Sequence, residues 1–129
     1  MMQRTGITQV TAAVRNPAKP DAAWEGLFLV DTGAIDCLVP GKHLRSLGIS
    51  PSDRRGYELA DGTPITFEVG VAQIEFMGDV VGATVIFGPD VAEPILGGTA
   101  LASVGIEVDP RSQRLTRLPA VRLKAKRVP

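Results

Sequence analysis

Short apolar runs separated by turn-forming residues make up most of the chain. Residues 6–14 alternate mildly between apolar and polar positions and predict a first strand, whereas residues 24–30 form a continuous apolar run that stops at Asp31. Continuous apolarity over so few residues predicts a strand that is buried on both faces. Between the two runs, Asn16-Pro17 and Lys19-Pro20-Asp21 predict a loop.

A hairpin is predicted in the middle of the chain. Tyr57 and Leu59 share one face of a first strand, apolar positions alternate again over residues 65–69, and Asp61-Gly62 lies between them. An Asp-Gly pair flanked by alternating apolar residues predicts a two-residue hairpin loop with a type I′ turn. Pro64 removes a hydrogen-bond donor beside this turn, which a sheet tolerates at a free tip. We therefore expect the hairpin to project outward.

The second half of the chain continues this pattern of strands. A second hairpin is predicted over residues 66–76 and 80–87, with its turn at Gly78-Asp79. The other predicted elements are short helices over residues 41–48 and 99–104 and a last strand pair over 106–108 and 114–116. No internal repeat or domain linker interrupts the chain. The fold class predicted from the pattern is all-β with one or two short helices.

Composition agrees with a single compact domain. The chain has 129 residues, of which 44% are hydrophobic, and this rules against a wholly disordered protein. No stretch approaches the roughly 20 apolar residues of a membrane span. The N-terminal residues lack the apolar core of a secretory signal, and the single cysteine cannot form an internal disulfide. We therefore expect a cytoplasmic protein that does not enter the membrane.

Charge is unevenly distributed along the chain. All 14 acidic residues but only seven of the 14 basic ones lie in residues 1–110, which leaves this part with a net charge of −7 and the remainder with +7. We interpret residues 119–129 as a solvated basic tail. A basic arm for nucleic acid is the alternative, but the tail has no aromatic residue for stacking on bases, so nucleic acid is an unlikely partner.

The candidate chemistry centres on Asp31-Thr32-Gly33. A carboxylate directly after a buried strand is unusual because removing an unpaired charge from water is costly. Thr32 can hydrogen-bond locally and fix the loop, and Gly33 permits a close backbone approach or a positive φ. The triplet alone is also compatible with a surface turn at the end of a strand, so its context decides the interpretation.

The context resembles the retropepsin-like aspartic peptidases. Residues 28–34 (FLVDTGA) match the active-site motif of that family, the hairpin with Asp61-Gly62 at its tip lies where the family has its flap, and residues 94–97 (PILG) before a short helix resemble its second signature. The resemblance extends over residues 6–118. It implies a small closed β-barrel with a flap hairpin, and a protease domain that spans residues 1–118.

Peptide hydrolysis by this route needs two carboxylates that share one proton across a bound water. The chain contains one Asp-Thr-Gly and no Asp-Ser-Gly, which implies a homodimer in which Asp31 meets its symmetry mate. The resemblance implies that Thr32 of the two chains interlocks beneath this pair, with Gly33 completing the motif, and that the flaps cover an extended peptide. The residues expected to contact this peptide are Ala34, Ala60, Asp61, Gly62 and Thr63.

Other functions remain open. The predicted flap tip has one glycine, Gly62, and Ile35 stands where the family more often has a small polar residue, so a peptide-binding module of the same fold without turnover is the alternative. A cysteine peptidase based on Cys37 and His43 is disfavoured, because no oxyanion motif accompanies them. One histidine and one cysteine cannot form a zinc site, and we expect no metal or cofactor. Asp36 could help to position Thr32 or the pair of catalytic carboxylates, but we expect it to point to solvent.

Overall fold

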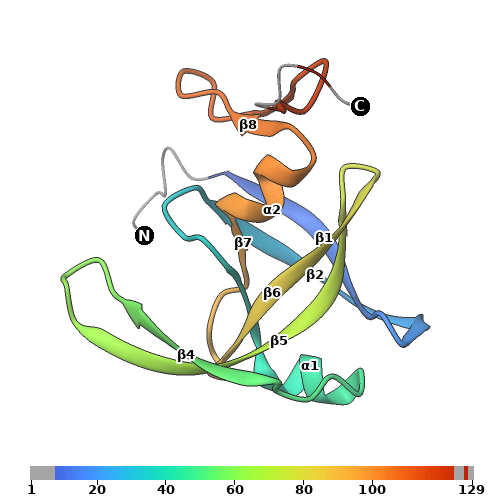
Figure 1. Ribbon diagram of the computed structural model, residues 1–129, viewed down its shortest axis with the longest axis vertical. Helices are drawn as coiled ribbons and strands as arrows, with labels where there is room; N and C mark the ends of the chain where they lie inside the picture. Colours follow the sequence, from blue (N-terminus) through green and yellow to red (C-terminus); the bar gives the residue numbers. More distant parts are fainter. Residues whose placement is uncertain (1–7, 124–126, 128–129) are drawn as a thin grey trace, which may run out of the picture.

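The chain forms a small all-β structure (Figure 1). The computed structural model describes residues 8–123 and 127. In chain order, the elements in this part are β1 Gln9–Asn16, β2 Lys19–Asp31, β3 Cys37–Pro40, α1 Gly41–Ser46, β4 Asp53–Glu58, β5 Pro64–Phe76, β6 Asp79–Gly88, β7 Ile95–Gly97, α2 Gly98–Ser103, β8 Ile106–Val108 and β9 Leu115–Arg117. The predicted all-β class with two short helices is confirmed.

Six strands pair in a ring. The order of hydrogen-bonded neighbours is β1-β2-β7-β3-β6-β5, and β5 also pairs with β1, so that the sheet returns to its first strand. We call this ring the barrel. The β2–β7 and β3–β6 pairs are parallel, and the others are antiparallel. Strand β4 extends the sheet beyond the ring by pairing with β5, and β8 and β9 form a separate two-stranded sheet.

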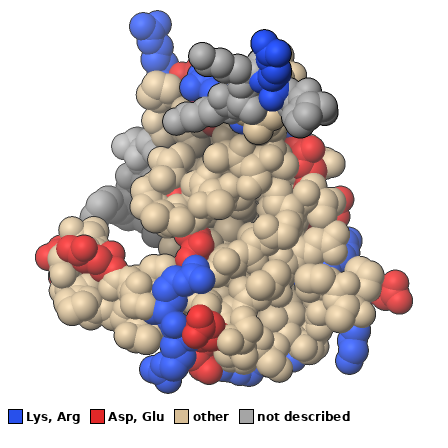
Figure 2. All heavy atoms as spheres, viewed as in Figure 1, with Lys and Arg blue, Asp and Glu red and all other residues tan. Residues whose placement is uncertain are grey.

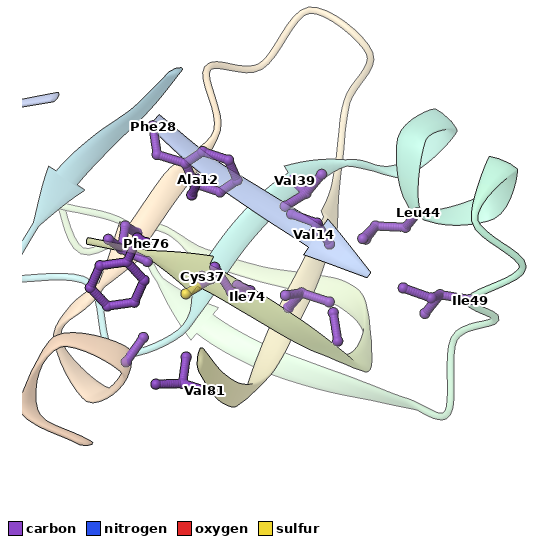
Figure 3. Packing of buried hydrophobic residues seen from close by; sticks show 14 of the residues in the cluster. Ala12, Val14, Phe28, Cys37, Val39, Leu44, Ile49, Ile74, Phe76 and Val81 are labelled. Atoms are coloured by element: carbon purple, nitrogen blue, oxygen red, sulfur yellow. The ribbon is translucent and has the colours of Figure 1, made fainter. Parts of the chain in front are cut away.

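The core fills the inside of the barrel (Figure 3). Phe28, Phe76 and Ile74 are fully buried there, because alternate residues of each strand point inward. The prediction that both faces of residues 24–30 are buried is wrong, since the Leu27 side chain is 53% exposed. In a barrel wall the outer face of a strand meets solvent unless another element covers it, so the run is buried on one face only.

The predicted loop before β2 is shorter than expected. Asn16 pairs with Lys19, so Lys19-Pro20-Asp21 belongs to the strand and the turn is confined to Pro17 and Ala18. The Asn16 side chain holds this turn, because its Oδ1 accepts the Ala18 N–H at 2.9 Å and its Nδ2 donates to the Leu47 carbonyl at 3.1 Å. A side chain that bonds the backbone two residues on allows a tighter turn than the two prolines suggested.

The turn type predicted at Asp61-Gly62 is also wrong. Of the central residues only Gly62 has a positive φ, of 86°, whereas a type I′ turn needs two. The Gly62 N–H donates to the Leu59 carbonyl and the Leu59 N–H to the Thr63 carbonyl, each at 2.8 Å, which gives a three-residue loop. Two consecutive positive φ angles occur instead in the β5–β6 turn, at Met77-Gly78.

The hairpin of β4 and β5 projects from the barrel as predicted. Strand β5 pairs with β6 only from Val69 onward, so the strand residues within 54–68 pair with each other and with no other strand of the described chain. In Figure 1 this hairpin extends to the left of the barrel, and its tip stands away from the other strands. We call residues 53–68 the flap hairpin.

The C-terminal strands are attached to the barrel by side-chain and backbone contacts. Arg117 forms an ion pair with Asp79 and donates to the Met77 carbonyl at 2.8 Å, and the Leu118 N–H donates to the Gly105 carbonyl at 2.8 Å. The bonds of Arg117 join β9 to the β5–β6 turn and the start of β6, and the bond of Leu118 joins the end of β9 to the segment between α2 and β8. No helix within residues 8–123 is long and apolar enough to cross a membrane.

Strand β7 approaches the loop after β2 so closely that it has no room for a side chain at Gly97. A Cβ atom on Gly97 would lie 2.6 Å from the Asp36 carbonyl oxygen and 2.8 Å from that of Ile35. The obstructing atoms are backbone atoms, which cannot move aside without shifting the whole loop. Gly82 of β6, by contrast, has no atom within 4 Å of such a Cβ and provides a matched control.

We predict that Gly97→Ala lowers the free energy of unfolding by at least ~2 kcal/mol, since it forces backbone segments apart. Gly82→Ala should change it by no more than about 0.5 kcal/mol. Urea denaturation of both variants measures the difference. Equal unfolding midpoints for the two variants would contradict the packing described for β7.

Cys37 lies in the core, as the apolar stretch around it predicted. Its side chain is 1% exposed, its Sγ accepts the Gly97 N–H at 3.4 Å, and burial raises the pKa of the thiol to about 11. We expect a disulfide reagent to react with Cys37 at pH 8 only after unfolding, because the reactive thiolate is disfavoured in the fold. Labelling with and without denaturant, followed by mass spectrometry, tests this; rapid labelling of the folded protein would contradict it.

Candidate functional site

The Asp-Thr-Gly motif forms a tight loop where β2 ends. The Gly33 N–H donates to Asp31 Oδ1 at 3.0 Å, and the Ala34 N–H donates to the Asp31 carbonyl at 3.2 Å. Asp31 is therefore held by its own loop through both its side chain and its backbone. Because Asp31 is the last residue of the strand, its carboxylate lies at the edge of the barrel and is partly exposed.

Strand β7 and helix α2 hold the other side of this loop. Asp31 is opposite Gly97 in the parallel β2–β7 pair. The Gly98 N–H donates to the Ala34 carbonyl at 2.6 Å, and the Thr99 N–H donates to the Ile35 carbonyl at 3.3 Å. The two segments that resemble the family signatures, residues 28–34 and 94–97, thus lie side by side.

Thr32 has a different role in the loop from the one expected, whereas Gly33 fits one of its two expected roles. Thr32 is exposed, and its hydroxyl forms no hydrogen bond within the described residues, so the prediction that it fixes the loop locally is wrong. The Asp31 carboxylate does this instead. A Cβ on Gly33 would lie 3.3 Å from Asp31 Oδ1, and its φ is not positive, so close approach rather than an unusual backbone angle favours glycine here.

The predicted substrate-binding residues fall into two groups. Ala34 belongs to the motif loop, whereas Ala60, Asp61, Gly62 and Thr63 form the exposed tip of the flap hairpin. Asp61 Oδ1 accepts the Thr63 N–H at 2.9 Å. Hydrogen bonding from the Thr63 side chain, followed by that from its N–H, lowers the pKa of the Asp61 carboxyl group. Among the described residues, no hydrogen bond joins the tip to the motif loop.

Asp36 connects the motif loop to the flap hairpin. Its Oδ2 accepts the Tyr57 hydroxyl at 2.7 Å and Arg55 Nη1 at 3.1 Å, and its side chain is only 11% exposed. The expectation that Asp36 points to solvent is wrong, because β4 crosses close to the loop and supplies two donors. Burial, together with the hydrogen bond to Asp36, raises the pKa of Tyr57 to about 12.

Sequence reasoning missed this connection, although one signal for it was present. Tyr57 lies on the same face of the predicted hairpin as the apolar residues, which indicates a side chain directed toward the body of the protein. A buried tyrosine hydroxyl needs a hydrogen-bond partner. The partner is 21 residues away in the sequence, and no local pattern identifies it.

A groove of about 710 Å³ lies beside the motif loop. Thr32, Ala34 and Ile35 line one side of it, and α2, β8 and residues 118–122 supply most of the remainder. Ile35 is 72% exposed, although it is one of the larger apolar residues of the chain. Neither Asp31 nor the flap tip lines the groove, so this hollow is distinct from the space between Asp31 and the tip.

The structure also bears on the cysteine peptidase alternative. Cys37 is a buried core residue with a raised pKa, and the His43 ring stacks on Trp24 with 4.1 Å between ring centroids. Burial, followed by the charge of Lys42, lowers the pKa of His43. A protonated, buried thiol is a poor nucleophile, so this alternative is not supported.

In the described part of the chain, no three His, Cys, Asp or Glu side chains are grouped to hold a metal ion.

Comparison with known proteins identifies the fold. No protein-family model and no curated protein matches the chain by sequence. The solution structure of simian foamy virus (mac) protease matches with a TM-score of 0.52 and 16% identity, over 73% of this chain and 91% of that one. EIAV protease in complex with the inhibitor HBY-793 matches with a TM-score of 0.52 and 17% identity, over 81% and 94% of the two chains.

A bacterial structure gives the same result. The retropepsin-like aspartic protease from Rickettsia conorii matches with a TM-score of 0.51 and 21% identity, over 83% of this chain and 88% of that one. Each match spans most of both molecules. This chain therefore has the fold of the retropepsin-like aspartic proteases.

Proposed function

We propose that the chain is one subunit of a homodimeric aspartic endopeptidase, with Asp31 as the catalytic carboxylate of each subunit. The observation that carries the proposal is the position of the Asp-Thr-Gly loop. It lies at the end of β2, packed against the backbone of β7 and α2, in a fold shared with retropepsin-like aspartic proteases.

The proposed reaction uses two Asp31 side chains, one from each chain, on either side of a water molecule. Two like charges this close cannot both be ionised, so the pair holds one proton between them. The ionised carboxylate removes a proton from the water as the water oxygen attacks the peptide carbonyl carbon, and the protonated carboxyl group donates its proton to the carbonyl oxygen. When the tetrahedral intermediate collapses, the C–N bond breaks. The proton taken from the water passes to the leaving nitrogen, and the proton on the carbonyl oxygen returns to the carboxylate pair. No cofactor or metal ion takes part in this proposal.

Each remaining residue of the motif has a place in this dimer. The Gly33 N–H, bonded to Asp31 Oδ1, orients the carboxylate. The exposed side chain of Thr32 is available to the second chain beneath the carboxylate pair. The adjoining groove, with the exposed Ile35 on its wall, supports a second copy of the chain as its occupant.

The peptide would lie extended between the motif loop and the flap tips. Extended peptides are held mainly through backbone hydrogen bonds, with side chains in pockets that give specificity. Ala34 on one side and residues 60–63 on the other are the proposed contacts. The projection of the flap hairpin away from the barrel supports this arrangement (Figure 1).

We predict that Asp31→Asn lowers the rate of peptide cleavage at least about a hundredfold, because an amide can neither accept nor share the proton. The assay is mass spectrometry of a peptide library incubated with each protein at several pH values. Asp21→Asn, an exposed change in the same strand, should retain full activity.

Two other results would contradict the proposal. Cleavage that survives in Asp31→Asn would remove this residue from the mechanism. A wild-type protein that binds peptides tightly but cleaves none at any pH would indicate the peptide-binding module without turnover.

We also predict that Asp31→Asn subunits inactivate wild-type subunits on mixing. If both carboxylates are needed, an equimolar mixture that exchanges subunits freely retains about one quarter of the activity of the same total amount of wild-type protein. Subunits that act independently would retain half. The measurement is the initial cleavage rate after refolding the two proteins together, with Asp21→Asn as the mixing control.

A further inference from the structure

We propose that Asp36 is a positioning residue that holds the flap hairpin at a fixed place relative to Asp31. Its carboxylate, with the Arg55 and Tyr57 donors of β4, forms a three-residue contact that we call the Asp36 clamp. The inference rests on the proposed function for its catalytic consequence. The clamp itself is a property of the chain that can be tested without catalysis.

The clamp joins two segments whose positions relative to each other matter for the proposed reaction. Asp36 lies five residues after Asp31, in the loop whose backbone is bonded to β7 and α2. Tyr57 lies one residue before the end of β4 and opposite Ile65, just below the hairpin tip. A shift of β4 would therefore move the tip directly relative to the loop that carries Asp31.

The flap hairpin has few other attachments. Among the described residues, the bonds to Asp36 are the only side-chain hydrogen bonds or ion pairs that join residues 53–66 to the rest of the chain. The Arg45–Glu68 ion pair, at 3.3 Å, lies nearer the barrel, and both of its side chains are well exposed. An isolated two-stranded hairpin is at best marginally stable in water, so a contact near its tip strongly affects its position.

The bonds of the clamp differ in strength. The Tyr57 hydroxyl donates at 2.7 Å to a carboxylate that is largely removed from solvent, and charge-assisted hydrogen bonds of this kind are the stronger ones. The Arg55 side chain is 48% exposed, so its ion pair is screened by solvent and contributes less. Figure 2 shows Lys and Arg atoms in a column at the lower centre of this face, with acidic atoms above the column and along its right side.

The two donors also limit what Asp36 can do for a substrate. Its Oδ2 is occupied by Tyr57 and Arg55, and the neighbouring side chain that is most open to solvent is Ile35. Asp36 therefore acts through the flap hairpin rather than on the peptide. Its loss should loosen the tip without altering the carboxylate chemistry at Asp31.

The test is amide hydrogen exchange of the free protein, followed by NMR spectroscopy. Tyr57→Phe removes one hydroxyl group and should speed the exchange of the Leu59 and Gly62 amides roughly tenfold, while core amides such as Ile74 stay unchanged. Asp36→Asn should also speed the exchange of these two tip amides. Arg54→Gln, next to Arg55 but without a bond to Asp36, is the matched control and should leave exchange at the wild-type rate.

Kinetics separate positioning from chemistry. Tyr57→Phe should raise KM severalfold and change kcat less than twofold, because a looser tip binds peptide less well but leaves Asp31 intact. If the tip amides exchange at the same rate in Tyr57→Phe as in Arg54→Gln, the clamp does not hold the tip and the proposal is overturned. If they exchange faster in Tyr57→Phe but its KM is unchanged, the clamp has no positioning role in catalysis. Should the wild-type protein cleave no peptide, the proposed function fails, and the exchange rates still decide whether the clamp holds the tip.

Discussion

The candidate site depends on one close backbone contact, between Gly97 of β7 and the loop that follows β2. The carbonyl oxygens of Ile35 and Asp36 lie where any side chain on Gly97 would be. This proximity allows the Gly98 N–H to reach the Ala34 carbonyl at 2.6 Å. The loop with Asp31 is thereby built onto the barrel by backbone atoms, which have little freedom to move.

The flap hairpin is attached in a different way. Near its tip, the hairpin is linked to the rest of the structure by side chains and not by pairing with a barrel strand. The link consists of the hydrogen bonds that Tyr57 and Arg55 donate to Asp36. Side-chain contacts are more easily broken than the backbone hydrogen bonds of a sheet. The loop that contains Asp31 and Asp36 is therefore bonded to a rigid support on one side and to the more loosely attached flap hairpin on the other. This combination would suit the proposed peptidase, in which Asp31 is held still while a peptide enters and leaves.

A single copy of the chain leaves part of the motif loop uncovered. Thr32 and Ile35 are exposed beside a groove of about 710 Å³, and this groove does not include Asp31. The C-terminal strands that form its other side are anchored to the barrel by Arg117. The surface next to the proposed catalytic residue is thus already shaped by one chain, and the proposed second copy adds the missing carboxylate.

The sequence by itself determined the class of the fold, most element positions and the two neighbouring signatures, because alternation of apolar residues and glycine-rich turns are local properties. It did not determine the turn at Asp61-Gly62, the exposed Leu27 or the partners of Asp36. Each of these depends on which segment packs alongside, and Asp36 lies 19 and 21 residues away in the sequence from its partners Arg55 and Tyr57. Only the tertiary structure brings such residues together, since burial and hydrogen bonding between distant segments leave no periodic pattern in the chain.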